Sequence, residues 1–327
     1  MDKNNEHIAW FDRIYVLNKR SKSLSFSSCP KGWNKDFSNY PFREWGRIGE
    51  ILIGIFVLAL ALISCEDVID VPVQTAPTRL VIEASLDWEK GTTGNEQTIR
   101  LRTSTPFFNT TEYTNVTGAS VKVTNDSNGT EFVFEDQNNG EYHTSGFIPV
   151  LGQSYTLEVV HNGETYNATE TLNAVPEITD LYQDVEDGFD DEVLELHVVF
   201  TDPPEEGNSY FFKFQKQGKR LPDLEVGHDE FVNGNEIDWW YELEEDDDTD
   251  EKEALAPGDV VGIEMYAISE AYKDYMEILI EQIGGVGLFE TTPVSIKGNC
   301  INLTNPDNYA HGYFRLTEVN KTSYTFE

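Results

Sequence analysis

The sequence is poor in cysteine, with only Cys29, Cys65 and Cys300 among its 327 residues. These cysteines lie far apart, so they supply neither a disulfide framework nor the ligand set of a zinc site. Six histidines are equally scattered, and no paired-histidine motif, Walker loop, Rossmann fingerprint or nucleophile elbow occurs. The sequence therefore offers no catalytic residues, and we expect a protein that is not an enzyme and carries no cofactor.

Positive charge is also scarce, because 23 Lys and Arg face 59 Asp and Glu. From Cys65 onward there are 14 basic and 53 acidic residues, which gives a formal charge of −39. Proteins bind nucleic acids and anionic lipid headgroups through Lys and Arg. The charge therefore argues against nucleic acid as a partner and against peripheral lipid binding. Part of this acidity serves solubility alone.

One strongly apolar run stands out, residues 51–64 with the sequence ILIGIFVLALALIS. Fourteen residues are too few to cross a bilayer, since a spanning helix needs about 20. The length suits the hydrophobic region of a signal peptide, and Arg43 and Arg47 precede it. An ordinary buried helix is the alternative, but no amphipathic periodicity marks a packing face.

The end of this run, Leu62, Ile63, Ser64 and Cys65, resembles the lipobox of bacterial lipoproteins. In that motif the cysteine thiol takes a diacylglyceryl group before the chain is cleaved on its amino side. Residues 1–64 are thus predicted to be a leader and lipoprotein signal peptide, although residues 1–45 form an unusually long polar leader. More than one acyl chain gives stable anchoring, so we expect a lipid-anchored protein of the outer membrane.

Residues 65–78 are predicted to form an acidic tether. Glu66 and Asp67 directly follow the cysteine. Acidic residues in this place resemble the surface-export signal of lipoproteins from the Bacteroidota, which would put the body outside the cell. The alternative is a solvated tether in a protein that is acidic throughout.

Residues 79–175 contain seven short segments in which apolar and polar residues mostly alternate. They are residues 80–86, 98–102, 119–124, 131–135, 141–145, 154–160 and 164–171. Alternation predicts strands with one buried face, and Asn162-Gly163 between two of them predicts a two-residue hairpin that places Val160 near Thr165. The pattern is typical of an immunoglobulin-like β-sandwich.

Residues 176–327 offer longer and more aromatic segments, so a second β-sandwich is expected after a boundary at Pro176. The predicted strands are residues 193–200, 209–216, 237–243, 259–268, 293–299 and 311–319. One helix is expected near 269–283, with Ser269 as its N-cap and Gly284-Gly285 at its end. The predicted fold class is all-β, with two immunoglobulin-like β-sandwich domains, the second carrying one inserted α-helix.

Two clusters in the second half are candidate binding sites. The acidic run at 242–253 includes Asp246, Asp248 and Asp250 as weak calcium candidates, because clustered oxygens suit hard cations. A solvated loop is the alternative, since blocks of like charge repel. Trp239, Trp240 and Tyr241 form a candidate aromatic platform for a ligand such as a carbohydrate. In a strand, however, Trp240 faces opposite to its two neighbours.

The order of the motifs resembles a Bacteroidota lipoprotein family known as domain of unknown function 4249. The resemblance rests on the lipobox cysteine, the strand at 80–86, the Gly-Ala-x-Val segment at 118–121 and the blocks at 267–275, 297–299 and 312–314. It implies a non-catalytic accessory role in nutrient capture beside a TonB-dependent outer-membrane receptor. The alternative is a structural or adhesive spacer at the cell surface.

Overall fold

The computed structural model describes residues 76–106, 114–185, 193–229, 233–243, 254–284 and 296–327. Residues 77–327 fall into one compact unit. Cys65 and the whole predicted leader lie outside the described residues, as do Asp246, Asp248 and Asp250. None of the described helices is long and apolar enough to span a membrane.

Most of the described chain is β-strand, and the single described helix is α3, Glu270–Gly284. The first seven strands are β1 Leu80–Glu89, β2 Gln97–Thr103, β3 Ser120–Asn125, β4 Glu131–Asp136, β5 Glu141–Thr144, β6 Ser154–His161 and β7 Glu164–Thr171. The others are β8 Ile178–Asp184, β9 Glu195–Thr201, β10 Ser209–Lys216, β11 Asp223–His228, β12 Glu236–Tyr241, β13 Val260–Ile268, β14 Ile301–Asn302 and β15 His311–Thr325. The all-β class with one inserted helix is confirmed.

The strands β1 to β7 match the seven alternating segments of the sequence. In β1, for example, Leu80, Ile82, Ala84 and Leu86 are buried and their neighbours are not. The hairpin between β6 and β7 is also confirmed, because Asn162 and Gly163 have φ values of 50° and 80° and Val160 pairs with Thr165. Positive φ at both central positions is what this turn requires.

Besides the two-residue β14, two strands, β8 and β11, were not predicted from the sequence. Each lies at the edge of a sheet, because the strand order is β12-β9-β8 in the small sheet and β11-β10-β13-β15-β1-β2-β5-β4-β3-β6-β7-β14 in the large one. Neither strand contains a fully buried residue. An edge strand with no buried face has no alternation to read, which is why the pattern missed both.

The strand predicted at residues 293–299 is wrong over its described part, residues 296–299, which contains no strand. Two residues explain the irregular course. The Asn299 amide takes the place of a paired backbone, since its oxygen accepts from Phe314 N and its nitrogen donates to Phe314 O, both at 2.8 Å. A Cβ at Gly298 would lie 1.3 Å from the Gly312 carbonyl oxygen, so the two backbones touch there.

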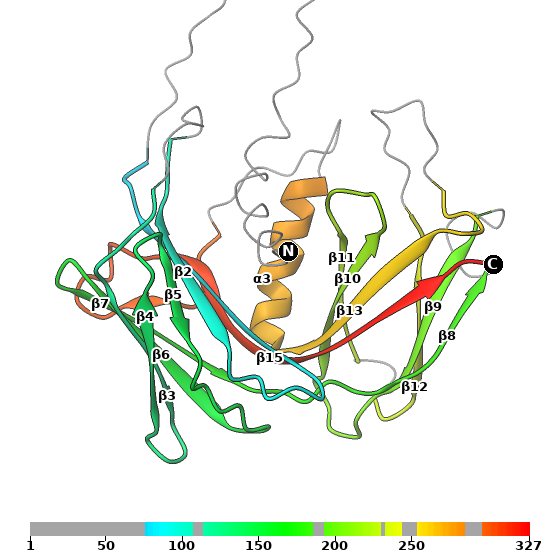
Figure 1. The fold of residues 1–327 in the computed structure, drawn as a ribbon, viewed down its shortest axis with the longest axis horizontal. Helices are drawn as coiled ribbons and strands as arrows, with labels where there is room; N and C mark the ends of the chain where they lie inside the picture. The colour runs from blue at the N-terminus through cyan, green and yellow to red at the C-terminus, as the bar shows by residue number, and fades with distance from the viewer. Residues whose placement is uncertain (1–75, 107–113, 186–192, 230–232, 244–253, 285–295) are drawn as a thin grey trace, which may run out of the picture. The chain divides into compact units, whose positions relative to one another are not determined.

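The last strand, β15, is shared between the two halves of the chain (Figure 1). It pairs in parallel with β1, from Val81 opposite His311 onward, and antiparallel with β13. Phe314 lies in the core formed by β1 to β7, whereas Phe326 lies in the core formed by β9, β10 and β13. The two halves thus have separate cores and one common strand. The domain boundary near Pro176 stays a prediction.

A third, smaller core lies on the other face of β10, β13 and β15, where α3 packs. It contains Phe211, Tyr266, Tyr272, Met276 and Tyr313. Side chains alternate along β15, so the strand can face the first core with Phe314 and Leu316 and the helix with Tyr313. Buried polar side chains also lie on this face of β15, beside the third core, and they are part of the site described next.

Candidate functional site

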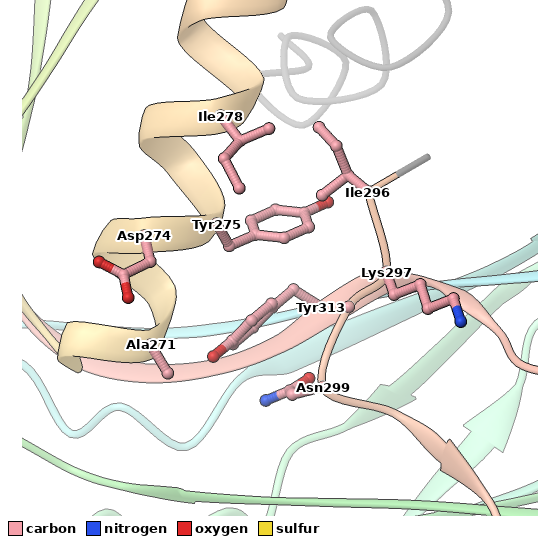
Figure 2. Close-up of a pocket in the computed structure, with 9 residues that line it drawn as sticks. Ala271, Asp274, Tyr275, Ile278, Ile296, Lys297, Asn299 and Tyr313 are labelled. Atoms are coloured by element: carbon pink, nitrogen blue, oxygen red, sulfur yellow. The ribbon is translucent and has the colours of Figure 1, made fainter. Parts of the chain in front are cut away.

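A pocket of about 540 Å³ lies between α3 and the segment that leads into β14 (Figure 2). Its lining residues are Ala271, Asp274, Tyr275, Ile278, Ile296, Lys297, Gly298, Asn299 and Tyr313. Figure 2 shows Tyr275 pointing from the helix toward Ile296 on the facing segment. A concave, largely apolar surface with a few polar groups is typical of small-molecule sites.

The helix holds Tyr275 in place through its first turn. Ser269 caps the helix as predicted, since its Oγ accepts a hydrogen bond from Tyr272 N at 3.2 Å. Tyr272 is buried against the sheet. The rings of Tyr272, Tyr275 and Tyr313 form a triangle, in which the Tyr275 centroid lies 6.0 Å from that of Tyr272 and 5.0 Å from that of Tyr313, and the last two are 4.9 Å apart. Stacked rings on a capped helix give the pocket a fixed floor.

Behind this floor lies the buried carboxyl of Glu170, on β7. Its Oε1 accepts hydrogen bonds from Tyr313 Oη at 3.0 Å and from Asn299 Nδ2 at 3.1 Å. Burial raises the pKa of Glu170 above its ordinary value, and burial likewise raises the pKa of Tyr313. Because Asn299 also binds the backbone of Phe314, these polar groups are engaged in holding the wall of the pocket.

The rim of the pocket carries both charge signs and an exposed aliphatic side chain. Lys297 Nζ lies 4.4 Å from the centroid of the Tyr309 ring. Asp274 pairs with Lys273 at 3.2 Å. Ile278 is 40% exposed although it is a large aliphatic residue. The rim therefore presents apolar surface together with one cation and one anion.

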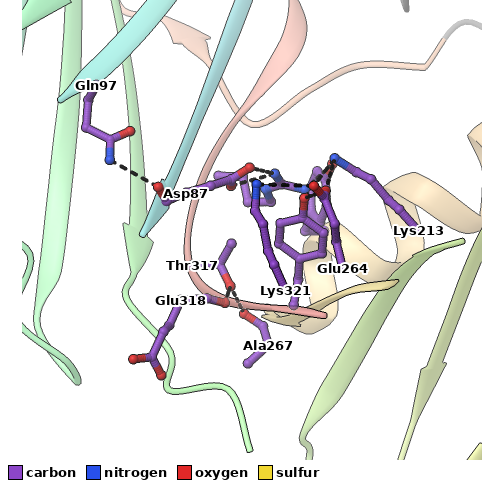
Figure 3. A network of polar contacts seen from close by, with 11 residues as sticks. Asp87, Gln97, Lys213, Glu264, Ala267, Thr317, Glu318 and Lys321 are labelled. Carbon is purple, nitrogen blue, oxygen red and sulfur yellow. Dashed lines mark hydrogen bonds and ion pairs between the residues drawn. The ribbon is translucent and has the colours of Figure 1, made fainter. Parts of the chain in front are cut away.

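Beneath α3, the buried guanidinium of Arg315 belongs to a polar network. Figure 3 shows other members of this network, among them Asp87, Lys213 and Glu264. The NH2 group of Arg315 donates to both carboxylate oxygens of Asp87, at 2.6 and 2.7 Å. The guanidinium also lies over the rings of Tyr266 and Tyr272, 4.7 and 5.1 Å from their centroids. Burial alone would lower the pKa of Arg315, but the charge of Asp87 outweighs burial and raises it, so the guanidinium stays charged. The ion pair joins β1 to β15.

The network continues across β10 and β13. Lys213 Nζ donates to Tyr266 Oη at 2.9 Å and lies 3.6 Å from Glu264, which Lys321 also contacts at 3.1 Å. Burial lowers the pKa of Lys213. Burial alone would raise the pKa of Glu264, but the charge of Lys213, the Tyr266 hydroxyl and Lys321 together lower it to about 2.

The aromatic run on β12 does not form one platform. Trp239 packs 4.6 Å from Phe212 between ring centroids and donates to Glu225. Tyr241 stacks on a core ring on the same side of the strand. Trp240 faces the opposite way, in register with His197 on β9. Strand alternation separates the three rings, so a ligand role stays a prediction for Trp240 alone.

Several candidate residues cannot be placed, because Leu62, Ile63, Ser64, Cys65, Glu66, Asp67 and the calcium candidates lie outside the described residues. The part of the chain that the structure describes holds no cluster of three or more His, Cys, Asp or Glu suited to a metal. Cys300 is buried, and burial raises the pKa of its thiol to about 12. Glu170, Asp87 and Arg315 carried no sequence signal, because their partners are remote in the chain.

The sequence of the chain matches one known protein family. The sequence profile of a family described as "Domain of unknown function (DUF4249)" matches residues 66–323. The chain belongs to this family. The match begins at Glu66, which directly follows Cys65, the predicted lipidation site. No curated protein matches the chain.

Three solved structures with weak overall similarity come from chicken. A two-domain fibronectin type-III segment of tenascin is 15% identical over 54% of this chain and 86% of its own, with a TM-score of 0.19. The FN1–FN3 domains of CNTN1 are 14% identical over 60% and 64%, with a TM-score of 0.24. The interferon gamma receptor alpha chain is 10% identical over 59% and 90%, with a TM-score of 0.19. The description of the fold rests on the strand pairing and not on these likenesses.

The Asp87→Asn substitution tests the buried pair. It leaves the Arg315 guanidinium buried without its counter-charge, and we expect the free energy of unfolding to fall by about 3 kcal/mol. Urea denaturation at pH 7 measures this change. The matched control is Glu131→Gln, which removes the carboxylate of a more exposed pair with Lys122 and should leave the unfolding midpoint unchanged. Equal effects of the two substitutions would contradict a structural role for Arg315.

The Glu264→Gln substitution tests the charge network through its pH dependence. The pKa of Glu264 is about 2 in the folded protein, below its ordinary value of 4.5, so ionised Glu264 stabilises the fold above pH 4.5. This stabilisation is lost as the pH falls from 4.5 toward 2. The difference in unfolding free energy between the parent protein and the variant should shrink over that window. A difference independent of pH would show that Glu264 acts through packing alone.

Proposed function

We propose that this chain is a lipid-anchored, non-catalytic binding protein of the outer membrane that assists a TonB-dependent receptor in nutrient capture. Cys65 supplies the anchor, and the pocket between α3 and the segment before β14 supplies the binding surface. The proposal of a binding role rests on the presence of this pocket.

The start of the family match supports the anchor. The matched region begins at Glu66, where the mature chain would continue after cleavage on the amino side of Cys65. The first described strand begins at Leu80, so residues 66–79 link the lipid to the folded body. A link of this length reaches at most roughly 45 Å when extended. The body would thus stay close to the bilayer.

The pocket favours binding over a structural or adhesive spacer. A spacer needs only closed cores, and the two larger cores of the structure contain no residue of α3. The helix and the segment at 296–299 add a concavity beside them, and Ile278 remains exposed at its rim. Unfilled apolar surface of this kind marks a place where another molecule binds.

The chemistry of the pocket supports a non-catalytic role. A general acid or base must direct a titratable atom at the bound substrate, within hydrogen-bond distance. Here the Oε1 atom of Glu170 is engaged by two donors, and the amide of Asn299 is engaged at both of its atoms. These contacts hold both side chains in place behind the wall of the pocket.

Purification of the intact lipoprotein from detergent-solubilised outer membrane tests the anchor and the partner together. We expect mass spectrometry to find a mature chain that begins at acylated Cys65 and a receptor barrel in the same fraction. The Cys65→Ser variant should lose the membrane fraction. An unmodified thiol with the leader attached would overturn the anchor. Recovery without any receptor, across several growth substrates, would overturn the accessory role.

The pocket is tested by thermal unfolding with a panel of oligosaccharides and short peptides. A ligand that binds the folded state raises the melting temperature by mass action. We expect a rise for the parent protein and for Val133→Glu, which alters an exposed residue on β4. Ile278→Glu should abolish the rise, because it puts a charge on the rim. No rise for any panel member would favour the spacer role, and an equal rise in all three proteins would place binding elsewhere.

A further inference from the structure

Strand β14 and the loop that leads from it to β15 expose two large aliphatic side chains. Ile301 is 63% exposed and Leu303 is 61% exposed. Between them, the buried Asn302 accepts hydrogen bonds from the backbones of Thr304 and Asn305, at 3.0 and 2.9 Å. These bonds fix the shape of the loop. A fixed segment that holds aliphatic groups in water indicates a contact surface.

Two cations lie on the ring of Tyr309, in the same loop. The Arg79 guanidinium lies 3.7 Å from the ring centroid and the Lys297 ammonium 4.4 Å. Arg79 also donates to the carbonyl of Asp307 at 2.9 Å, which fastens the loop to the start of β1. Ile301, Leu303, Tyr309, Arg79 and Lys297 are together called the Tyr309 surface below.

The two cations differ from most others in this acidic chain. Ten other described Lys and Arg side chains form ion pairs with carboxylates. Arg220, after β10, forms no ion pair among the described residues, and neither do Arg79 and Lys297. Their charge is therefore available to an anionic group outside the protein, and phosphate oxygens suit both side chains.

The Tyr309 surface lies where the tether enters the body. Arg79 directly precedes β1, so the residues that follow Cys65 end at this surface. A second aliphatic loop, with Ile148 60% exposed, lies at the other end of β7. Backbone hydrogen bonds fix the two loops to opposite ends of β7. Leu303 N donates to Thr165 O at the start of the strand, whereas Gly152 N donates to Leu172 O just beyond its end. Seven residues of strand separate these points by roughly 23 Å.

We propose that the Tyr309 surface rests on the bilayer that holds the acylated Cys65. This inference depends on the anchor put forward above. Ile301 and Leu303 enter the headgroup region, the Tyr309 ring lies at the interface, and Arg79 and Lys297 meet lipid phosphates. The contact sets the orientation of the body, with the Ile148 loop facing away from the lipid.

The net charge of −39 does not prevent this contact. At physiological ionic strength the Debye length is about 8 Å, so charges on distant parts of the body are screened from the bilayer. Local charges decide the contact, and locally the surface carries two cations. The anchor also makes the contact intramolecular, so it needs only a weak intrinsic affinity. We therefore expect the folded body without its lipid not to bind vesicles.

The inference is tested with the mature lipoprotein in phosphatidylcholine vesicles that contain a doxyl-labelled lipid quencher. A fluorophore is attached to an introduced cysteine, in Leu303→Cys or in the matched variant Ile148→Cys. The lipidated Cys65 has no free thiol and Cys300 is buried, so the introduced cysteine takes the label. We expect lipid to quench the fluorophore at position 303 and not at position 148.

A second arm tests the cations. Lys297→Gln in the Leu303→Cys background should lower the quenching at position 303. Arg220→Gln, which removes another exposed cation from the turn after β10, should not. Unchanged melting temperatures confirm that the variants fold.

Flotation separates the outcomes. If the lipoprotein does not float with vesicles, the anchor itself fails. If it floats but quenching is equal at the two positions, or greater at position 148, the anchor stands and the orientation is overturned. Protection of position 303 by a co-purified receptor, without quenching by lipid, would also overturn the inference and assign the Tyr309 surface to a protein partner.

Discussion

The ion pair between Arg315 and Asp87 is the contact on which the rest of the structure depends. It joins the last strand to the first across 228 residues of sequence, at the place where β15 is shared by the two halves of the chain. A guanidinium buried this deeply needs a partner of opposite charge, and aromatic rings complete its surroundings. Parallel pairing of β1 with β15 brings the two residues together, so the register of these strands and the ion pair support each other.

The candidate pocket is built outward from this pair. Tyr272 contacts the guanidinium from the helix, Tyr275 stacks on Tyr272, and Tyr313 closes the floor from β15. The floor thus rests on buried residues, whereas the rim at Ile278 remains exposed. A rigid floor beneath an open rim allows a ligand to bind without ordering the protein around it, which favours affinity.

The acidic and the basic side chains of this protein have different roles. The acidic excess keeps the body soluble and repels nonspecific anionic partners. Most of the described cations are paired with carboxylates and stabilise contacts between strands, as Lys213 and Lys321 do around Glu264. The unpaired Arg79 and Lys297 lie where the tether meets the body. If a lipid holds Cys65, this arrangement orients a protein whose overall charge would otherwise keep it away from a membrane.

The sequence by itself determined the β class, the seven strands of the first half, the Asn162-Gly163 hairpin and the capped helix, because each depends on neighbours a few residues away. It also carried the resemblance of residues 62–65 to a lipobox and the family resemblance. Only the tertiary structure decided the edge strands β8 and β11, the irregular course of residues 296–299, the inward direction of Trp239 and the polar groups around Arg315. Those features depend on contacts between residues far apart in the chain, and no local periodicity encodes which remote side chain will lie opposite.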